Sequence, residues 1–293
     1  MARSAEMTRL TWTAAAVLAA LTAVGGPAQA SRHWPTPAAG QSSSGDPEVI
    51  FTFDDGPDAK WTAEILDTLA AHKVQAIFYW VGRRVAKTRP TAEKNKLLVD
   101  RALEEGHLIG NHTVHHVHLC HTPEPDAARE IDHNREVYEG LARLPIILFR
   151  VPYGDLCQRV GTLLGDRGLW HLHWDIDARE YLGLSSKETA QYIIGRLKRL
   201  TGRAVLLMHD TQGASARALP LVLAWIEKEN AARLADGRRP IRIVGASDLV
   251  AERADAALWR WWEDGADAVA RRIGRAATSL VPGARIPSAL TRR

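Results

Sequence analysis

From residue 47 onward, apolar and polar positions alternate between two spacings. Short runs rich in Ile, Val, Leu and aromatic residues are typical of buried strands, and they lie at 48–53, 76–81, 108–111, 146–150, 169–174, 204–208 and 241–244. Between these runs, apolar residues recur every three or four positions, which predicts helices at 61–72, 92–105, 126–141, 187–200 and 219–234. Strands joined by helical crossovers imply a parallel sheet.

The continuous alternation of seven strands with helices favours an α/β fold in which the sheet closes, or nearly closes, into a βα barrel. An open, doubly wound sheet is the alternative. No Gly-x-Gly-x-x-Gly run follows any of the strands, so a dinucleotide-binding fold has no support.

The first thirty residues have the pattern of a secretory signal peptide. Arg3 and Arg9 precede an apolar, alanine-rich stretch at 13–24, and Ala28-Gln29-Ala30 fits a cleavage site. We therefore expect a signal peptide at 1–30 and a secreted or periplasmic protein, with an uncleaved N-terminal anchor as the alternative. Residues 31–46 are rich in Pro, Gly and Ser and predict a flexible linker. The catalytic domain is then expected at 47–255.

The C-terminal segment 256–293 is predicted to be a helical tail. Its tryptophans, Trp259, Trp261 and Trp262, are followed by several arginines. The favoured interpretation is a terminal helix that packs its tryptophans on the barrel, because Trp usually buries area. The alternative is an amphipathic helix that makes a peripheral contact with the cell envelope.

Composition places the chain among globular proteins, with 46% hydrophobic and 25% charged residues. The net charge of +4 and pI of about 9.2 suit an anionic envelope surface. No basic and aromatic stripe stands out, so a nucleic-acid partner is not expected. In an exported protein the two cysteines, Cys120 and Cys157, can form a disulfide, and two separate thiols are the alternative.

Polar side chains cluster after the predicted strands, where the working residues of a βα barrel lie. They are Asp54 and Asp55 after the first strand, His112 and His116 after the third, 150–154 after the fourth, Asp175, Asp177 and Glu180 after the fifth, and His209 and Asp210 after the sixth. This placement predicts one cleft that contains all of them.

Two of these clusters together have the chemistry of a metal site. His112 and His116 are four residues apart, so on a helical turn both rings would face one ion. Zinc binds imidazole nitrogens and carboxylate oxygens, and a catalytic site keeps one position for water. One acid of the Asp54–Asp55 pair would complete the ligand set.

Four ordered motifs carry a resemblance to a known family. They are Thr52-Phe53-Asp54-Asp55-Gly56-Pro57, His112-Thr113-x-x-His116, Arg150-x-Pro152-Tyr153-Gly154 and Leu207-Met208-His209-Asp210. Together they resemble the polysaccharide deacetylases, the NodB-homology group of carbohydrate esterase family 4, over residues 47–249. The resemblance implies a distorted (β/α)7 barrel, in agreement with the strand count.

The resemblance also implies roles for the residues at matching positions. Asp55, His112 and His116 would hold Zn²⁺ or another divalent cation such as Co²⁺. Asp54 would be the general base, with Arg150 paired to it. His209 would be the general acid.

Further roles concern the substrate pocket. The backbone N–H of Tyr153 would help to stabilise the oxyanion, and Leu207 would line the pocket for the acetyl methyl group. Where the family usually has Asp-Trp, this chain has Glu180-Tyr181. Glu180 would then orient His209 and Tyr181 would cap the pocket, with Asp177 as a rival partner for His209.

The expected function is a secreted, metal-dependent deacetylase acting on N-acetyl groups of an amino-sugar polysaccharide, such as peptidoglycan, a chitin-like polymer or poly-GlcNAc. Its expected partner is the acetylated polysaccharide or oligosaccharide substrate. An O-acetyl esterase of the xylan type is an alternative, because the same groups attack esters. A non-catalytic carbohydrate-binding or wall-binding protein is the alternative from another class.

Overall fold

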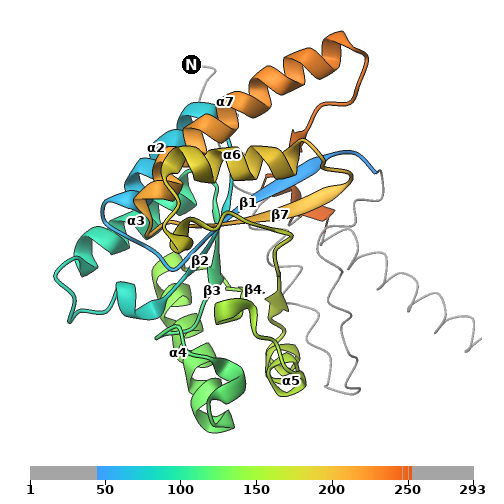
Figure 1. Cartoon of the computed structure of the whole chain (residues 1–293). Helices are drawn as coiled ribbons and strands as arrows, with labels where there is room; N and C mark the ends of the chain where they lie inside the picture. Colours follow the sequence, from blue (N-terminus) through green and yellow to red (C-terminus); the bar gives the residue numbers. More distant parts are fainter. Residues whose placement is uncertain (1–44, 246, 250, 253–293) are drawn as a thin grey trace, which may run out of the picture. The chain divides into compact units, whose positions relative to one another are not determined.

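A computed structural model of the chain describes residues 45–245, 247–249 and 251–252 (Figure 1). The chain divides into two compact units, and the residues described up to Asp248 belong to one of them. The predicted signal peptide, the linker apart from its last two residues and the tail at 256–293 lie outside the described residues.

The strands form one sheet in which every pairing is parallel. They are β1 (Glu48–Asp54), β2 (Ile77–Trp80), β3 (Leu108–Asn111), β4 (Leu148–Phe149), β5 (Trp170–His171), β6 (Ile176–Asp177), β7 (Arg203–His209) and β8 (Arg242–Ile243). Their order is β5-β4-β3-β2-β1-β7-β6, with β8 beside the start of β1. The predicted distorted (β/α)7 barrel is therefore confirmed, with its gap between β5 and β6.

Six α-helices connect the strands and pack on the outside of the sheet (Figure 1). They are α2 (Trp61–His72), α3 (Ala92–Glu104), α4 (Glu124–Ala142), α5 (Gln158–Asp166), α6 (Ser186–Leu197) and α7 (Gly213–Ala235). Four single 3-10 turns lie in the loops: η1 (Gly82–Arg84), η2 (Leu119–His121), η3 (Pro152–Gly154) and η4 (Glu180–Leu182). Neighbouring helices pack in the order α6, α7, α2, α3, α4, which follows the order of the strands they cover.

The core explains why β1 is the central strand. All seven of its residues are buried, as expected for a parallel strand covered on both faces. Phe53 stacks on Phe78 of β2 with ring centroids 5.2 Å apart, and Phe78 packs against Trp80 at 5.1 Å. Aromatic packing therefore fixes β1 against β2 just before both strands deliver polar side chains to the carboxyl edge of the sheet.

A second, smaller hydrophobic cluster lies under α5. Val160, Leu163 and Leu164 pack with Phe149 of β4 and with Leu119 of η2. Cys120 and Cys157 contact this cluster and form a disulfide, with 5.9 Å between their Cα atoms. Of the two alternatives for the cysteines, the structure therefore contains the bridge.

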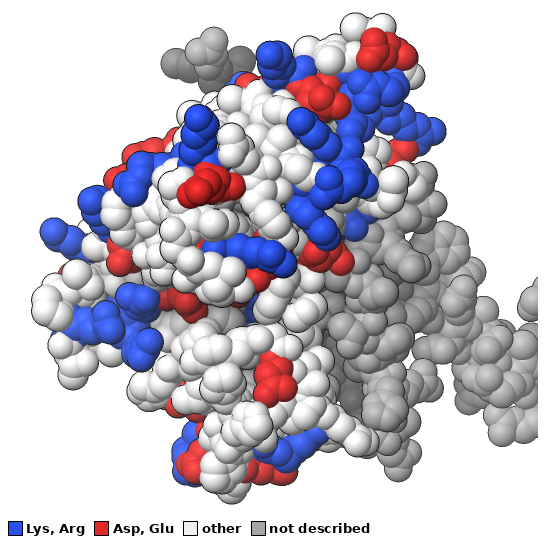
Figure 2. Space-filling model, viewed as in Figure 1, with Lys and Arg blue, Asp and Glu red and all other residues white. Residues whose placement is uncertain are grey.

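The surface carries both signs of charge. Figure 2 shows basic side chains interspersed with acidic ones over the face in view, without a single-sign field covering it. Among the residues that the structure describes, none of the helices is both long and apolar enough to span a bilayer.

Candidate metal centre and active site

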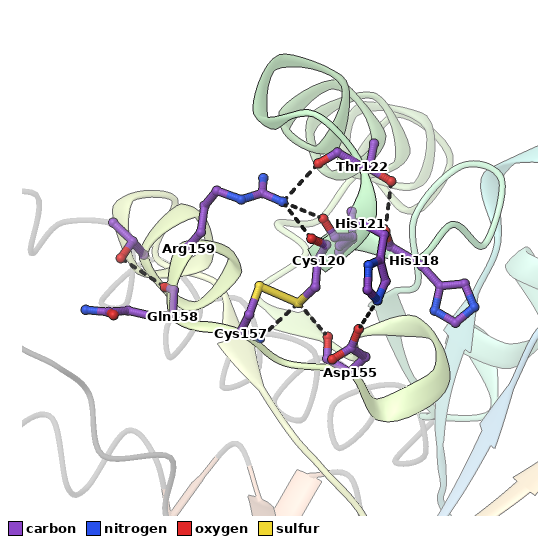
Figure 3. The surroundings of a disulfide bond; sticks show 10 residues. His118, Cys120, His121, Thr122, Asp155, Cys157, Gln158 and Arg159 are labelled. Carbon is purple, nitrogen blue, oxygen red and sulfur yellow. Dashed lines mark hydrogen bonds and ion pairs between the residues drawn. A yellow bond between two sulfur atoms is a disulfide. The ribbon is translucent and has the colours of Figure 1, made fainter.

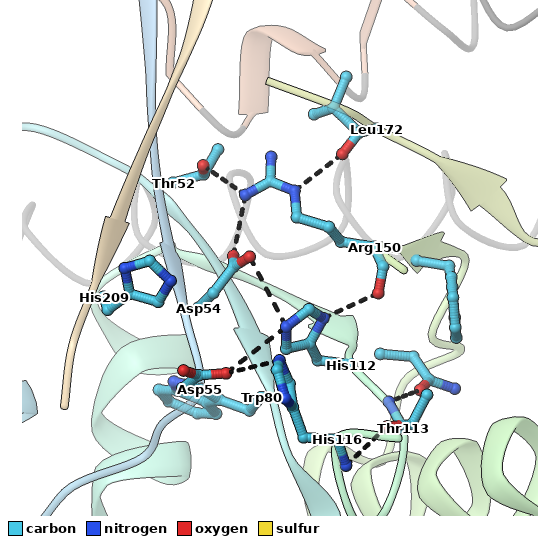
Figure 4. A network of polar contacts seen from close by, with 12 residues as sticks. Thr52, Asp54, Asp55, Trp80, His112, Thr113, His116, Arg150, Leu172 and His209 are labelled. Atoms are coloured by element: carbon cyan, nitrogen blue, oxygen red, sulfur yellow. Dashed lines mark hydrogen bonds and ion pairs between the residues drawn. The ribbon is translucent and has the colours of Figure 1, made fainter. Parts of the chain in front are cut away.

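Three side chains from two strand ends meet at the carboxyl edge of the sheet (Figure 4). Asp55 follows β1, and His112 and His116 follow β3. Asp55 Oδ1 lies 3.2 Å from His116 Nε2 and 3.6 Å from His112 Nε2. One ligand atom from each residue lies within 4.8 Å of the other two, so the group is compact enough to hold one ion.

The hydrogen bonds of these residues suit a divalent cation. His112 Nδ1 lies 2.8 Å from the carbonyl oxygen of Arg150, so Nδ1 carries the proton and donates it. The lone pair of Nε2 then faces Asp55, as in other histidine ligands oriented by a carbonyl. Asp55 Oδ1 is buried and has no hydrogen-bond donor among the described residues. A buried, unpaired carboxylate oxygen beside an imidazole lone pair is the donor set that zinc and similar ions bind.

Protonation states at the site favour the same ion. Burial and, to a smaller extent, the nearby His112 lower the pKa of His116 to about 4, so His116 is neutral at physiological pH. Burial opposes ionisation of Asp55, but the surrounding histidines and Arg84 lower the pKa of Asp55 below its usual value. Neutral imidazole and ionised carboxylate are the forms that coordinate metals.

The prediction that His112 and His116 share a helical turn is wrong. Residues 112–118 form a loop with a bend, and Thr113 and His116 have positive φ values of 65° and 60°. Side-chain hydrogen bonds hold this loop: Asn111 Oδ1 accepts from Thr113 N–H at 2.9 Å, and Thr113 Oγ1 accepts from His116 N–H at 3.0 Å. Such local bonds compete with helix formation, and they still bring both imidazoles to Asp55.

Asp54, the predicted base, is paired with Arg150 inside the barrel. Asp54 is 3% exposed and Arg150 is fully buried. Arg150 Nη1 donates to Asp54 Oδ1 at 2.8 Å and to Thr52 Oγ1 at 2.7 Å, and its Nε donates to the Leu172 carbonyl at 2.8 Å. The guanidinium also lies 4.2 Å from the ring centroid of Tyr79.

The other carboxylate oxygen of Asp54, Oδ2, lies 3.7 Å from His112 Nε2, so it faces the metal-binding group.

His209, the predicted acid, ends β7 directly beside Asp54, its register partner on β1. Its Nδ1 lies 2.9 Å from Glu180 Oε1, which also accepts from the His209 N–H at 2.6 Å and from Ser215 Oγ at 2.6 Å. Burial by itself would lower the pKa of His209, but the hydrogen bond and charge of Glu180 raise it to about 9. His209 is therefore protonated at neutral pH.

The rival partner, Asp177, is engaged elsewhere. Asp177 Oδ2 accepts from the Tyr181 hydroxyl at 2.7 Å, and Oδ1 accepts from the Arg179 N–H at 2.9 Å. The structure therefore brings Glu180, rather than Asp177, to His209.

The predicted pocket residues surround the same group. Tyr153 lies in η3 with a φ of 61°, and its ring centroid is 4.5 Å from that of His116. Its N–H has no acceptor among the described residues. Leu207 is buried on β7, and the ring of Tyr181 approaches that of His209 edge-on at 5.6 Å. Tyr153 and Tyr181 are both more than half exposed.

Sequence reasoning missed the partners of Asp210. The Trp80 Nε1–H donates to Asp210 Oδ2 at 2.8 Å and the Thr62 hydroxyl donates to the same oxygen at 2.7 Å. Burial raises the pKa of Asp210 to about 7. Trp80 is fully buried and is thus a core residue that supports the site. The only sequence signal for these contacts was the position of Asp210 directly after His209 at a strand end.

Comparisons with known proteins agree with this geometry. A family model described as polysaccharide deacetylase matches residues 41–169. A peptidoglycan-N-acetylglucosamine deacetylase of Bacillus cereus is 31% identical over 188 residues, which are 63% of this chain and 65% of that protein, so the chain spans slightly less than two thirds of that relative. A chitooligosaccharide deacetylase of Sinorhizobium fredii is 33% identical over 172 residues, 58% of this chain and 75% of that protein.

A solved structure shares the fold. It is a family 4 carbohydrate esterase from Streptomyces lividans in complex with acetate. It superposes with a TM-score of 0.55 at 25% identity, covering 62% of this chain and 89% of that one.

Proposed function

The chain belongs to the polysaccharide deacetylase family, and on that premise we propose that it is a metal-dependent hydrolase that removes N-acetyl groups from an amino-sugar polysaccharide or oligosaccharide. The observation that carries the proposal is the placement of a carboxylate and an imidazole at the ends of neighbouring strands, each held by its own charged partner. Asp54 is held by Arg150, and His209 is held by Glu180. Figure 4 shows His209 on one side of the paired acids and the two histidines of the metal-binding group on the other.

Asp55, His112 and His116 would hold the cation, which we propose is Zn²⁺ or another divalent ion such as Co²⁺. When bound, such an ion supplies Lewis-acid polarisation of a carbonyl group and lowers the pKa of a water molecule.

Asp54 suits the role of general base. Its Oδ1 is occupied by Arg150, whereas Oδ2 faces the metal-binding group. Oδ2 is therefore the oxygen that takes the proton of the attacking water as the oxygen–carbon bond forms. Arg150 holds the carboxylate in this orientation and stabilises its charge before the transfer.

His209 suits the role of general acid. Amide hydrolysis is slow because the nitrogen leaves poorly unless it is protonated as the carbon–nitrogen bond breaks. Glu180 accepts the Nδ1 proton of His209, so Nε2 is the nitrogen that delivers a proton to the departing amine. The raised pKa of His209, about 9, keeps this proton available at neutral pH.

The remaining residues shape the acetyl site. The N–H of Tyr153 is free to donate to the oxyanion that develops on the carbonyl oxygen. Leu207 and Tyr181 would line the pocket for the methyl group. We also propose that the protein works outside the cytoplasm, which rests on the signal-like sequence at 1–30.

Acetate release tests the proposal. The metal-loaded protein is incubated with chitooligosaccharides, N-acetylated peptidoglycan strands and acetylated xylan, each with and without a chelator. We expect release from the amide substrates that stops on chelation and returns when the metal is restored. Release from xylan alone would favour the O-acetyl esterase, and binding without any release would favour the non-catalytic alternative.

A further inference from the structure

The disulfide joins two loops that each carry a group of the active site. Cys120 lies in η2, four residues after His116, and Cys157 lies four residues after Tyr153. The bond therefore links the loop that follows β3 to the loop that follows β4. Figure 3 shows it between the two chain segments, with Asp155 and His121 nearby.

Both active-site residues have a backbone conformation that L-residues avoid. The φ values are 60° for His116 and 61° for Tyr153. In this region the Cβ atom crowds the neighbouring carbonyl oxygen, so a residue other than glycine stays there only where its surroundings impose it. Neither loop has regular secondary structure longer than one 3-10 turn. The Thr113 hydroxyl, which accepts the His116 N–H, supports the first loop from within, and contacts between the loops supply the rest of the constraint.

Two direct contacts between the loops depend on the relative position of His116, His118 and Tyr153. The Tyr153 hydroxyl donates to the His116 carbonyl at 3.2 Å, and the ring of His118 stacks on that of Tyr153 at 3.6 Å with an interplanar angle of 8°. Both rings lie at the exposed rim of the site, where water competes for such contacts. Exposed contacts of this kind are individually weak and easily broken.

Arg159 of α5, which is half-buried, adds hydrogen bonds next to the disulfide. One of its guanidinium nitrogens, Nη2, donates to the carbonyls of Leu119 at 2.8 Å, Thr122 at 2.9 Å and Cys120 at 3.3 Å (Figure 3). These bonds hold the far end of the loop that follows His116. They do not reach His116 or Tyr153 themselves, and the disulfide adds a covalent link between the two loops that carry these residues.

We infer that Cys120 and Cys157 are positioning residues for the proposed reaction, whose disulfide fixes His116 and the Tyr153 N–H relative to each other. The bond itself takes no part in the chemistry. The inference rests on the proposed function for its effect on turnover, but not for its effect on loop order or metal affinity. Preorganisation of this kind matters because a displacement of about 1 Å can cost on the order of a hundredfold in rate.

The double variant Cys120→Ser/Cys157→Ser, with the metal saturating, tests the inference. We expect kcat/KM to fall by about ten- to a hundredfold at a temperature where circular dichroism shows the protein folded. We also expect the Kd for Co²⁺ to rise by about tenfold, and amide hydrogen exchange to speed up at 113–118 and 151–155. Leu197→Ala is the matched control, because it destabilises the buried face of α6 without touching either loop.

Unchanged kcat/KM, Co²⁺ affinity and loop exchange in the folded double variant would overturn the inference, since the bond would then only stabilise the fold. If the double variant does not fold, the same readouts apply to wild type treated with a phosphine and then alkylated. That reduction converts the disulfide to two thiols and the phosphine to its oxide, with oxygen from water. If wild type itself releases no acetate, the proposed function fails, and the affinity and exchange measurements still decide the positioning role.

Discussion

Glu180 Oε1 lies 2.9 Å from Nδ1 of His209 and accepts three hydrogen bonds, two of them from His209 itself. A glutamate here takes the position that an aspartate usually has in the family. Glu180 begins η4, directly after Arg179 in the left-handed region, and its carboxylate is buried against Ser215. Glu180 therefore raises the pKa of His209, the proposed acid.

The first prediction concerns Glu180→Gln. In wild type, His209 loses its proton as pH rises through about 9, so turnover should fall there. Without the carboxylate, burial remains and lowers the pKa of His209, so the alkaline limb of the kcat profile should move to lower pH. Asp177→Asn is the control and should leave this limb in place. An alkaline limb that moves in the control and stays fixed in Glu180→Gln would assign the pairing to Asp177.

The second prediction concerns the buried pair of Arg150 and Asp54. Arg150→Met leaves Asp54 as an uncompensated buried charge, so the free energy of unfolding should fall by about 3–5 kcal/mol, and turnover should be lost. The control is Arg129→Met, which removes an exposed pair with Asp126 on α4 and should cost about 1 kcal/mol or less. Denaturant unfolding measures both. Equal losses in the two variants would mean that the buried pair adds no more than a surface pair.

The third prediction uses the fully buried Asp210. Its pKa is raised from 3.8 to about 7 because burial disfavours the charge. The unfolded chain ionises this acid at pH about 4, whereas the folded chain resists ionisation up to about 7. The free energy of unfolding of wild type therefore falls as pH rises from about 4 to about 7, and this loss is constant above that. Asp210→Asn cannot ionise. The free energy of unfolding of Asp210→Asn minus that of metal-free wild type should therefore increase between pH 5 and pH 8. A difference that does not change with pH would contradict the assigned pKa.

Much of the fold follows from the hydrophobic pattern, and the exceptions have identifiable causes. The strand at Glu48–Asp54 and the helix at Trp61–His72 appear where predicted, because long buried runs carry a clear period. β6 (Ile176–Asp177) was not predicted, because its two residues do not lie in a longer apolar run, whereas the equally short β4 lies in the apolar run at 146–149. α7 begins at Gly213, six residues before the predicted start at 219, and continues through Pro220. Proline is tolerated in the first turn of a helix and is unfavourable in its interior, so the sequence around Pro220 gives no sign that the helix begins a turn earlier.

Part of the site could likewise be predicted from the sequence, and part of it depends on contacts that only the folded chain makes. Asp55, His112 and His116 could be grouped because strand ends converge at one edge of a barrel. The loop conformation could not be foreseen, since it depends on side-chain bonds from Asn111 and Thr113. The contact of Asp210 with Trp80 joins residues 130 positions apart, and only the folded chain brings them together.

Metal content and acetate release, measured side by side in Asp54→Asn and His112→Ala, separate the base from the metal ligands. We expect Asp54→Asn to bind the metal as wild type does while turnover falls by at least about a hundredfold, because only the base is lost. His112→Ala should lose both the metal and the activity. If Asp54→Asn lost its metal as completely as His112→Ala, or still released acetate at the wild-type rate, Asp54 would not be the base and the proposed mechanism would be wrong.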